Sequence, residues 1–159
     1  MSQAWTIFGT GAHARKAAHC ALRGGDSVVA FVDENPAATS PLPGVPVMTA
    51  AAWRASADSG SALFVAIGRA EVRRRLMDEA RAQGWRLPPL QHPMASVAPD
   101  AGLGDGVLVA AGAVVESGTR IGRGAIVDIG VLVDHDVVVA DFCHLRPGQV
   151  CPAGSVWPA

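Results

Sequence analysis

The chain has 159 residues, half of them hydrophobic and 17% charged, with a formal net charge of −1 and a pI near 6.5. That length fits one large domain or two small ones with a substantial core. The near-neutral charge gives no basis for binding nucleic acid or an anionic membrane surface. No apolar run reaches the roughly 18 residues that a transmembrane helix needs.

Three cysteines, Cys20, Cys143 and Cys151, lack CxxC spacing and cannot all pair. We expect reduced thiols rather than a disulfide framework, with the later two packed inward. The first residues show no basic region or cleavage pattern of a signal peptide. These features predict a cytoplasmic protein, and we expect neither membrane insertion nor a metal cofactor.

The first 33 residues have the pattern of a β-α-β unit. An apolar strand is expected at 4–9, a helix at about 12–22 that ends before Gly24-Gly25, and a second strand at 27–33. The second strand ends in a carboxylate. The first strand is followed at once by a glycine turn, Thr10-Gly11-Ala12-His13.

The turn formed by Gly9 and Gly11 predicts a nucleotide site. Such a turn places backbone N–H groups and a helix N-terminus where a phosphate can bind. Asp33 and Glu34 occupy the place where a ribose hydroxyl is usually bound, and His13 is a candidate phosphate or sugar contact. The alternative is a tight turn without a ligand, because the third glycine of the dinucleotide fingerprint is absent. The spacing favours a mononucleotide half-fold over a full NAD domain.

The next segments complete a small parallel α/β sandwich. In the helix expected at 71–83, we predict that Arg73, Arg74 and Arg75 mostly face solvent. The other expected elements are a proline-rich loop at 35–46, an edge strand at 45–47, a helix at 50–57 that ends near Asp58-Ser59-Gly60, a third strand at 62–67 followed by Gly68, and a fourth strand at 87–92.

From Val97 onward an apolar or packing-type residue recurs every six residues. The anchors are Val97, Leu103, Val109, Val115, Ile121, Val127, Val133, Val139, Leu145, Cys151 and Trp157. A period of six fits neither a helix nor conventional hairpins, and it predicts a parallel β-helix with three hexads to a triangular coil. A solenoid of about three coils needs support at its ends and sides, which predicts trimerisation. The expected domains are therefore 1–92, Rossmann-like, and 93–159, the hexapeptide-repeat β-helix.

Two histidines in the repeats, His135 and His144, are candidates for chemistry. They lie nine residues apart, half a coil, so we expect them on different sides of the prism, with a shared site between adjacent subunits. Imidazole accepts a proton near neutral pH, and a neighbouring carboxylate, Asp134 or Asp136, can fix its tautomer. The alternative is that both are surface histidines without a role.

Together these motifs resemble the NeuD/PglD group of sugar O- or N-acetyltransferases. The resemblance covers nearly the whole chain and rests on the GxG-H turn, Val-Asp-Glu-Asn-Pro, Phe-Val-Ala-Ile-Gly, Arg-Arg-Arg-Leu, His-Pro and Val-Asp-His-Asp, in that order. It implies a left-handed β-helix, a homotrimer, acetyl-CoA as the donor, and a nucleotide-sugar acceptor. The acceptor would be a UDP-amino sugar or a CMP-sialic-acid-like sugar.

The resemblance also implies roles for individual residues. His135 would be the general base, Asp136 would orient its imidazole, and His144 would lie near the thioester of the cofactor. The residues that would face the nucleotide are Gly9, Gly11, His13, Asp33, Glu34 and Gly68.

Two departures from the family pattern leave the function open. Asp128 stands beside the expected acceptor, where the amino-sugar branch usually carries Asn, so the acceptor and the choice between N- and O-acetylation stay open. The family continues for further coils after the match to 139–150, and those coils build much of the CoA groove. The alternative to an acetyltransferase is therefore a nucleotide-sugar-binding or assembly protein with an incomplete CoA site.

Overall fold

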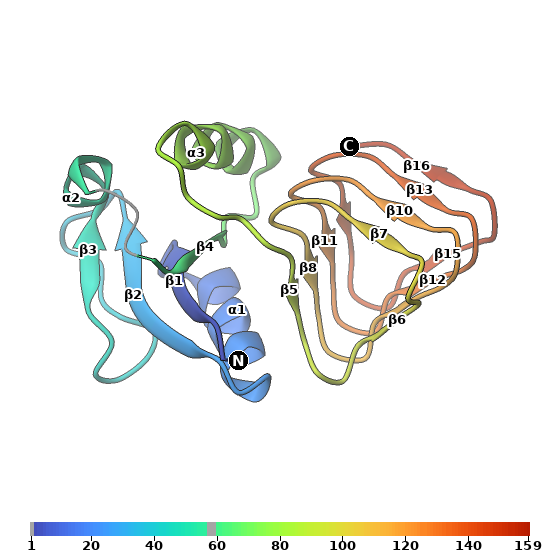
Figure 1. Cartoon of the computed structure of the whole chain (residues 1–159), viewed down its shortest axis with the longest axis horizontal. Helices are drawn as coiled ribbons and strands as arrows, with labels where there is room; N and C mark the ends of the chain where they lie inside the picture. Colours follow the sequence, from blue (N-terminus) through green and yellow to red (C-terminus); the bar gives the residue numbers. More distant parts are fainter. Residues whose placement is uncertain (1, 57–59) are drawn as a thin grey trace. The chain divides into compact units, whose positions relative to one another are not determined.

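The computed structural model describes residues 2–56 and 60–159. The chain divides into two compact units, Met1–Pro88 and Pro89–Ala159 (Figure 1). The first combines helices with a small sheet, and the second is a β-helix.

The N-terminal unit is built on a four-stranded parallel sheet with the order β3-β2-β1-β4. Strands β1, β2 and β4 are fully buried at Ile7, Phe31 and Leu63, respectively, as expected for a parallel sheet whose faces are covered. The elements are β1 (Ala4–Phe8), α1 (Ala12–Arg23), β2 (Ser27–Asp33), β3 (Val47–Thr49), α2 (Ala50–Ala55), β4 (Ala62–Val65) and α3 (Ala70–Ala82).

Small side chains let α1 lie close to the sheet. Ala14, Ala17, Ala18 and Ala21 are buried at helical spacing. The α2 helix ends at Ala55. It was expected to continue to 57 and to end near Asp58-Ser59-Gly60. Residues 57–59 of that stretch lie outside the described part of the chain.

Two expectations about this unit are wrong. The strand expected at 87–92 does not join the sheet: only Arg86 forms a bridge to Ala62, and β5 (Leu90–Gln91) pairs with β8 of the β-helix instead. Pro88 and Pro89 explain the break, because proline cannot donate to a strand ladder. The repeat structure therefore begins at Leu90, before the first anchor seen in the sequence.

Arg73 was predicted to face solvent, but it is buried. Its side chain is 1% exposed, and Nη1 donates to the carbonyls of Ile67 and Gly68 at 2.7 and 2.9 Å. Its neighbours Arg74 and Arg75 are exposed. The helical period explains the difference, because Arg73 lies on the same face of α3 as the buried Leu76 and Ala80.

The C-terminal unit is a left-handed β-helix with three parallel sheets. Each two-residue strand pairs with the strand eighteen residues away, as Gly102 with Arg120 and Arg120 with Val138. The sheets have the orders β14-β11-β8-β5, β15-β12-β9-β6 and β16-β13-β10-β7. Their strands are β6 (Ser96–Val97), β7 (Gly102–Leu103), β8 (Leu108–Val109), β9 (Val114–Val115), β10 (Arg120–Ile121), β11 (Ile126–Val127), β12 (Leu132–Val133), β13 (Val138–Val139), β14 (His144–Leu145), β15 (Val150–Cys151) and β16 (Val156–Trp157).

The predicted anchors form the core of this prism. The anchors from Val109 to Cys151 are at most 3% exposed, and the small or β-branched residues four positions later pack beside them. Cys143 and Cys151 lie in this core as free thiols, as expected. Burial raises the pKa of Cys151 to about 11, so it remains a protonated packing group.

The corners of the coils depend on the left-handed backbone conformation. Nine corner residues have φ between 57° and 72°: Gly106, Gly112, Gly118, Gly124, Gly130, Gly148, Gly154, Asp136 and Phe142. All of these N–H groups except that of Gly106 donate to the preceding coil, for example from Gly148 to the Ile129 carbonyl at 2.9 Å. Within the described residues, Asp136 and Phe142 are the only non-glycine residues with positive φ. Two corners therefore carry a side chain where glycine is the easy choice.

Gly148 tests the cost of this conformation. It has φ of 72°, and a Cβ built there meets nothing within 4 Å, so Gly148→Val should destabilise the protein only through the backbone. We expect a loss of about 1–2 kcal/mol in the free energy of unfolding, measured by urea denaturation. Gly148→Asn is the matched control, because Asn tolerates positive φ, and it should cost clearly less. Equal losses for Val and Asn would show that φ is not the cause.

Substitution of Arg73 tests how much its buried hydrogen bonds to the β4–α3 loop contribute to stability. Arg73→Met keeps much of the side-chain volume but leaves the Ile67 and Gly68 carbonyls without this donor. We expect a loss of about 2–4 kcal/mol, measured as a lowered denaturation midpoint. Arg74→Met, at the exposed neighbouring position, should change stability by less than about 0.5 kcal/mol. Similar effects of the two substitutions would contradict this account.

Candidate active site

A cavity of about 460 Å³ opens at the carboxyl ends of β1, β2 and β4. Parallel α/β sheets bind ligands at this edge. The cavity brings together five of the residues predicted to face a nucleotide: Gly9, Gly11, His13, Asp33 and Gly68. It is also lined by Thr10, Ala12, Ala66, Ile67 and Arg69.

The glycines that line this cavity are favoured for different physical reasons. Gly9 has φ of 110°, and a Cβ there would lie 3.1 Å from the Ala66 carbonyl oxygen, so a side chain would be strained and crowded. Gly68 approaches His13, since its Cβ would lie 3.3 Å from the imidazole Cδ2. Gly11 caps the N-terminus of α1 and has no side chain to accept from the first-turn N–H groups. That end of α1 has the properties of an anion site.

Asp33 is held in place at the cavity wall. Its carboxylate accepts from the Thr10 hydroxyl at 2.6 Å and from the Asn35 N–H at 2.9 Å. Sequence reasoning did not assign Thr10 a role, although the hydroxyl stands between the two glycines of the turn. Thr10 joins the glycine turn to the end of β2 and so sets the shape of the cavity.

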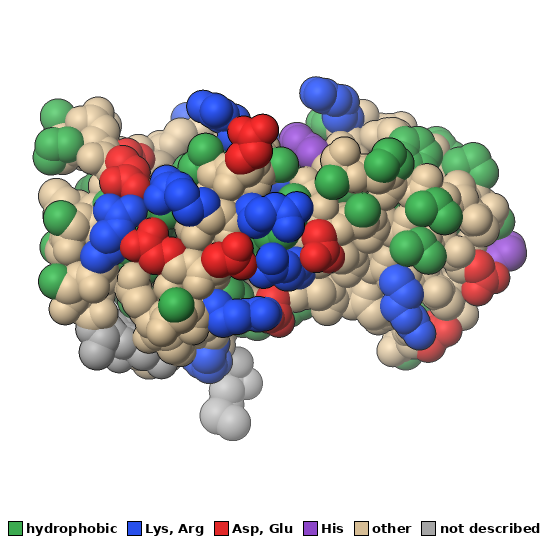
Figure 2. Space-filling view, turned by 90° about the horizontal axis from the view of Figure 1, so that it is seen from above, with side chains coloured by type: hydrophobic (Ala, Val, Ile, Leu, Met, Phe, Trp, Pro, Cys, Tyr) green, Lys and Arg blue, Asp and Glu red, His purple; other side chains and the backbone are tan. Residues whose placement is uncertain are grey.

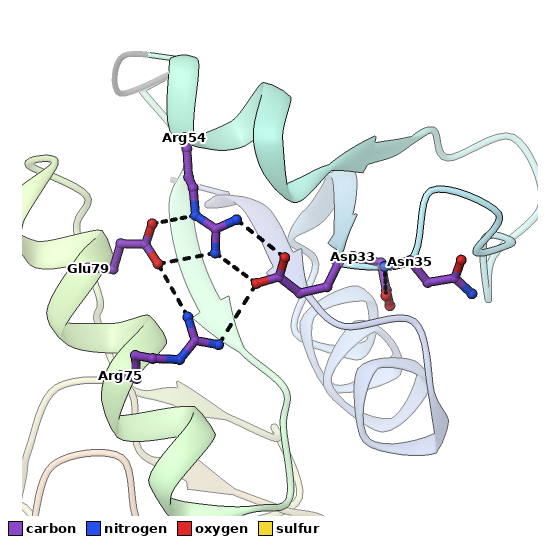
Figure 3. A network of polar contacts seen from close by, with 6 residues as sticks. Asp33, Asn35, Arg54, Arg75 and Glu79 are labelled. Carbon is purple, nitrogen blue, oxygen red and sulfur yellow. Dashed lines mark hydrogen bonds and ion pairs between the residues drawn. The ribbon is translucent and has the colours of Figure 1, made fainter.

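Glu34, which was predicted to face the nucleotide together with Asp33, is instead part of an ion-pair network outside the cavity. Its carboxylate accepts from Arg54 at 2.7 Å, and Arg54 also contacts Glu79 at 2.6 Å (Figure 3). Arg75 adds longer ion pairs to both carboxylates, each at 3.8 Å. The Arg54 hydrogen bond lowers the pKa of Glu34 below its usual value. Glu34 does not line the cavity, and its carboxylate instead links β2 to α2 and α3.

His135 lies in a corner of the β-helix, between β12 and β13, and is paired with Asp136. His135 Nδ1 is 2.8 Å from Asp136 Oδ2, and both side chains are more than half exposed. The hydrogen bond to Asp136, followed by the charge of Asp134, raises the pKa of His135 above its usual value. Because the carboxylate accepts from Nδ1, the neutral ring presents Nε2 as its proton acceptor.

The backbone shows that Asp136 occupies an unusual position. It has φ of 57°, whereas the residues eighteen positions away on either side, Gly118 and Gly154, are glycines with φ near 70°. A side chain at Gly118 would collide with the Asp136 carboxylate. The corner therefore adopts a conformation that favours glycine and yet carries the carboxylate that His135 binds. Such exceptions concentrate at functional sites.

His144, at the start of β14, has a separate carboxylate partner. Its Nε2 is 3.0 Å from Asp128 Oδ2, and the Asp128 side chain is 4% exposed. Asp128 was expected beside the acceptor, and its pairing with His144 was not anticipated. The eighteen-residue register was the available signal, because Ile126 pairs with His144 and so places Asp128 one coil below.

The two histidines occupy different parts of the prism. His135 follows β12 of one sheet, and His144 begins β14 of another. The structure gives each its own carboxylate and does not bring the two rings into one cluster. Across residues 2–56 and 60–159, no group of three or more His, Cys, Asp or Glu could hold a metal ion. The same residues contain no helix long and apolar enough to cross a membrane.

The comparisons with known proteins agree for both units. A family model described as the PglD N-terminal domain matches residues 6–80. The structure of a His-to-Asn mutant of perosamine N-acetyltransferase from Caulobacter crescentus, in complex with CoA and GDP-perosamine, superposes with a TM-score of 0.90 and 35% sequence identity. That match covers 96% of this chain and 73% of the other.

Two further structures share the architecture. The acetyltransferase domain of PglB from Neisseria gonorrhoeae FA1090, in complex with acetyl coenzyme A, has a TM-score of 0.84, 31% identity and coverage of 94% of this chain and 73% of that chain. WeeI from Acinetobacter baumannii AYE matches at a TM-score of 0.81 over 94% and 72% of the two chains, and at 21% identity it supports the fold alone. With the sequence motifs, these matches show that the chain belongs to the PglD-type family of hexapeptide-repeat sugar acetyltransferases.

Proposed function

We propose that this protein transfers an acetyl group from acetyl-CoA to an amine or hydroxyl group of a nucleotide-linked sugar. The observation that carries the proposal is the His135–Asp136 pair, held on a left-handed corner where the neighbouring coils have glycine. The relatives support the substrates, because the Caulobacter enzyme was seen with CoA and GDP-perosamine and the Neisseria domain with acetyl coenzyme A.

In the proposed reaction, Nε2 of neutral His135 accepts the proton of the attacking amine or hydroxyl. The nucleophile forms a bond to the thioester carbonyl carbon, and the tetrahedral intermediate then breaks its C–S bond. The proton held by His135 passes to the departing sulfur, so CoA leaves as the thiol and the base is regenerated. Asp136 keeps the ring in the required tautomer and stabilises the imidazolium.

The cavity of the N-terminal unit is proposed to bind the nucleotide of the acceptor. The N-terminus of α1 between Gly11 and His13 would hold a phosphate, and Asp33 would accept from a ribose hydroxyl. Gly9 and Gly68 leave room for the ligand to approach the backbone. Glu34 is assigned to the Arg54 network instead, since it does not line the cavity.

A homotrimer with His144 near the thioester of acetyl-CoA completes the proposal. Support comes from the outer face of the sheet that contains β12, where Leu132 and Val150 are 46% and 57% exposed. Val114 joins them in lining a groove of about 270 Å³, which Glu116 and Asp134 also line. Figure 2 shows another face of the β-helix unit, where scattered hydrophobic side chains and few charged ones are exposed, whereas charged side chains gather on the N-terminal unit. Exposed apolar surface of this kind is typical of an interface.

Substitution of the His135 pair tests the chemistry. His135→Asn should lower kcat about 10²- to 10⁴-fold, because general base catalysis contributes on that order. Asp136→Asn, which tolerates the left-handed backbone, removes the charge that raises the pKa of His135. Since the base must be neutral, the acidic limb of kcat/KM should move to lower pH in this variant, together with a lower rate.

The assay is thiol release from acetyl-CoA with a panel of GDP-, UDP- and CMP-sugars. His19→Asn, at an exposed position of α1, is the control and should leave the rate unchanged. Undiminished turnover in His135→Asn would reject the assignment of the base. Failure of the wild-type protein to bind acetyl-CoA in calorimetry would reject the acetyltransferase and favour a nucleotide-sugar-binding protein.

Binding of the nucleotide tests the cavity independently of catalysis. Asp33→Asn should weaken the binding of the acceptor nucleotide-sugar about tenfold, the effect of one lost hydrogen bond to a charged group. Glu34→Gln is the matched control at the next residue, and calorimetry should find its affinity unchanged. A loss of affinity in Glu34→Gln as large as that in Asp33→Asn would show that the ribose is held elsewhere.

A further inference from the structure

The β-helix unit contains a buried carboxylate, Asp128, to which the proposed reaction gives no task. It is 3% exposed, and each oxygen has a different neighbour. Oδ1 accepts from the backbone N–H of Ile129 at 2.8 Å, and Oδ2 lies 3.0 Å from His144 Nε2. A carboxylate this deep requires partners that satisfy its charge, and these two contacts are among them.

We propose that Asp128 is a positioning residue that fixes the proton of neutral His144 on Nε2, which leaves Nδ1 as the proton-accepting nitrogen of the ring. The assignment follows from the chemistry of the two groups. A carboxylate only accepts hydrogen bonds, and a carboxyl group is far more acidic than an imidazolium. The proton between Asp128 Oδ2 and His144 Nε2 therefore belongs to the ring.

The contact with Ile129 makes the effect specific to a carboxylate. In Asp128→Asn, the Ile129 N–H still requires an oxygen opposite it, so the amide oxygen takes the place of Oδ1. The amide NH₂ then faces His144 Nε2 and donates to it. The ring must accept at Nε2 and carry its proton on Nδ1. Exchange of one oxygen for an NH₂ group thus reverses the polarity of both ring nitrogens.

The carboxylates of the two pairs described above consequently bind different ring nitrogens of their histidines. Asp136 binds Nδ1 of His135, so the proton acceptor of that ring is Nε2, whereas Asp128 binds Nε2 of His144. Under the proposed function, on which this consequence rests, His144 donates from Nδ1 only as an imidazolium, and Asp128 is the counterion that supports that charge. Its hydrogen bond to a developing oxyanion is then charge-assisted.

Nuclear magnetic resonance of histidine tests the inference on the full chain without any assay of activity. Long-range ¹H–¹⁵N correlation at about pH 9, where imidazoles are neutral, distinguishes a protonated ring nitrogen from a bare one. His144→Gln identifies the signals of His144 among the five histidines. In the wild-type protein we expect the proton of His144 on Nε2, and in Asp128→Asn on Nδ1.

Asp136→Asn is the matched control, because it alters the other pair and should leave the His144 signals unchanged. A wild-type His144 protonated on Nδ1 would overturn the proposal, and this result does not depend on whether any variant folds. An unchanged tautomer in folded Asp128→Asn would overturn it as well. Because the readout is a tautomer, failure of the acetyltransferase proposal would leave this test unaffected.

Discussion

The left-handed corner is the constraint on which the β-helix unit depends. An eighteen-residue coil closes into a triangle only if the chain turns sharply three times, and from Gly112 to Gly154 each turn places one residue at positive φ. The N–H of that residue then bonds to the coil below, so the same residue turns the chain and joins the coils. Glycine meets this requirement without steric cost, and the hydrophobic core fills the prism that the corners enclose.

Because the corners are so uniform, their exceptions carry information. Asp136 and Phe142 replace glycine within two residues of His135 and His144, respectively. At Asp136 the reason is visible, since the carboxylate reaches the imidazole at 2.8 Å. At Phe142 the ring is buried, and the guanidinium of Arg123 lies over it at 5.0 Å. The scaffold thus bears its backbone strain next to the histidines and nowhere else among the corners of the described coils.

The sequence predicted much of the fold, because a period of six leaves few physical solutions and the anchors from Val109 to Cys151 are buried as expected. It also predicted the glycine turn and Asp33 at the cavity, since the turn directly follows β1 and Asp33 is the last residue of β2. It failed where a contact depends on three-dimensional packing rather than on spacing. Arg73 looked like one of three solvated arginines, yet the helix turns it inward to the carbonyls of Ile67 and Gly68. Glu34 pairs with Arg54, twenty residues away, and no local sequence pattern predicts that partner.

The eighteen-residue register also limits how such a chain can change in length. A strand one residue out of phase would turn its anchor outward and its exposed neighbour into the core, because side chains alternate across a strand. An insertion inside a coil would shift the pairing of every strand that follows it, including the pairing of Ile126 with His144. Genetic insertions and deletions are therefore tolerated as whole coils or as loops that bulge from a corner. The β-helix can therefore lengthen or shorten by whole coils, and the distance along its axis between two functional residues is set by the number of coils between them.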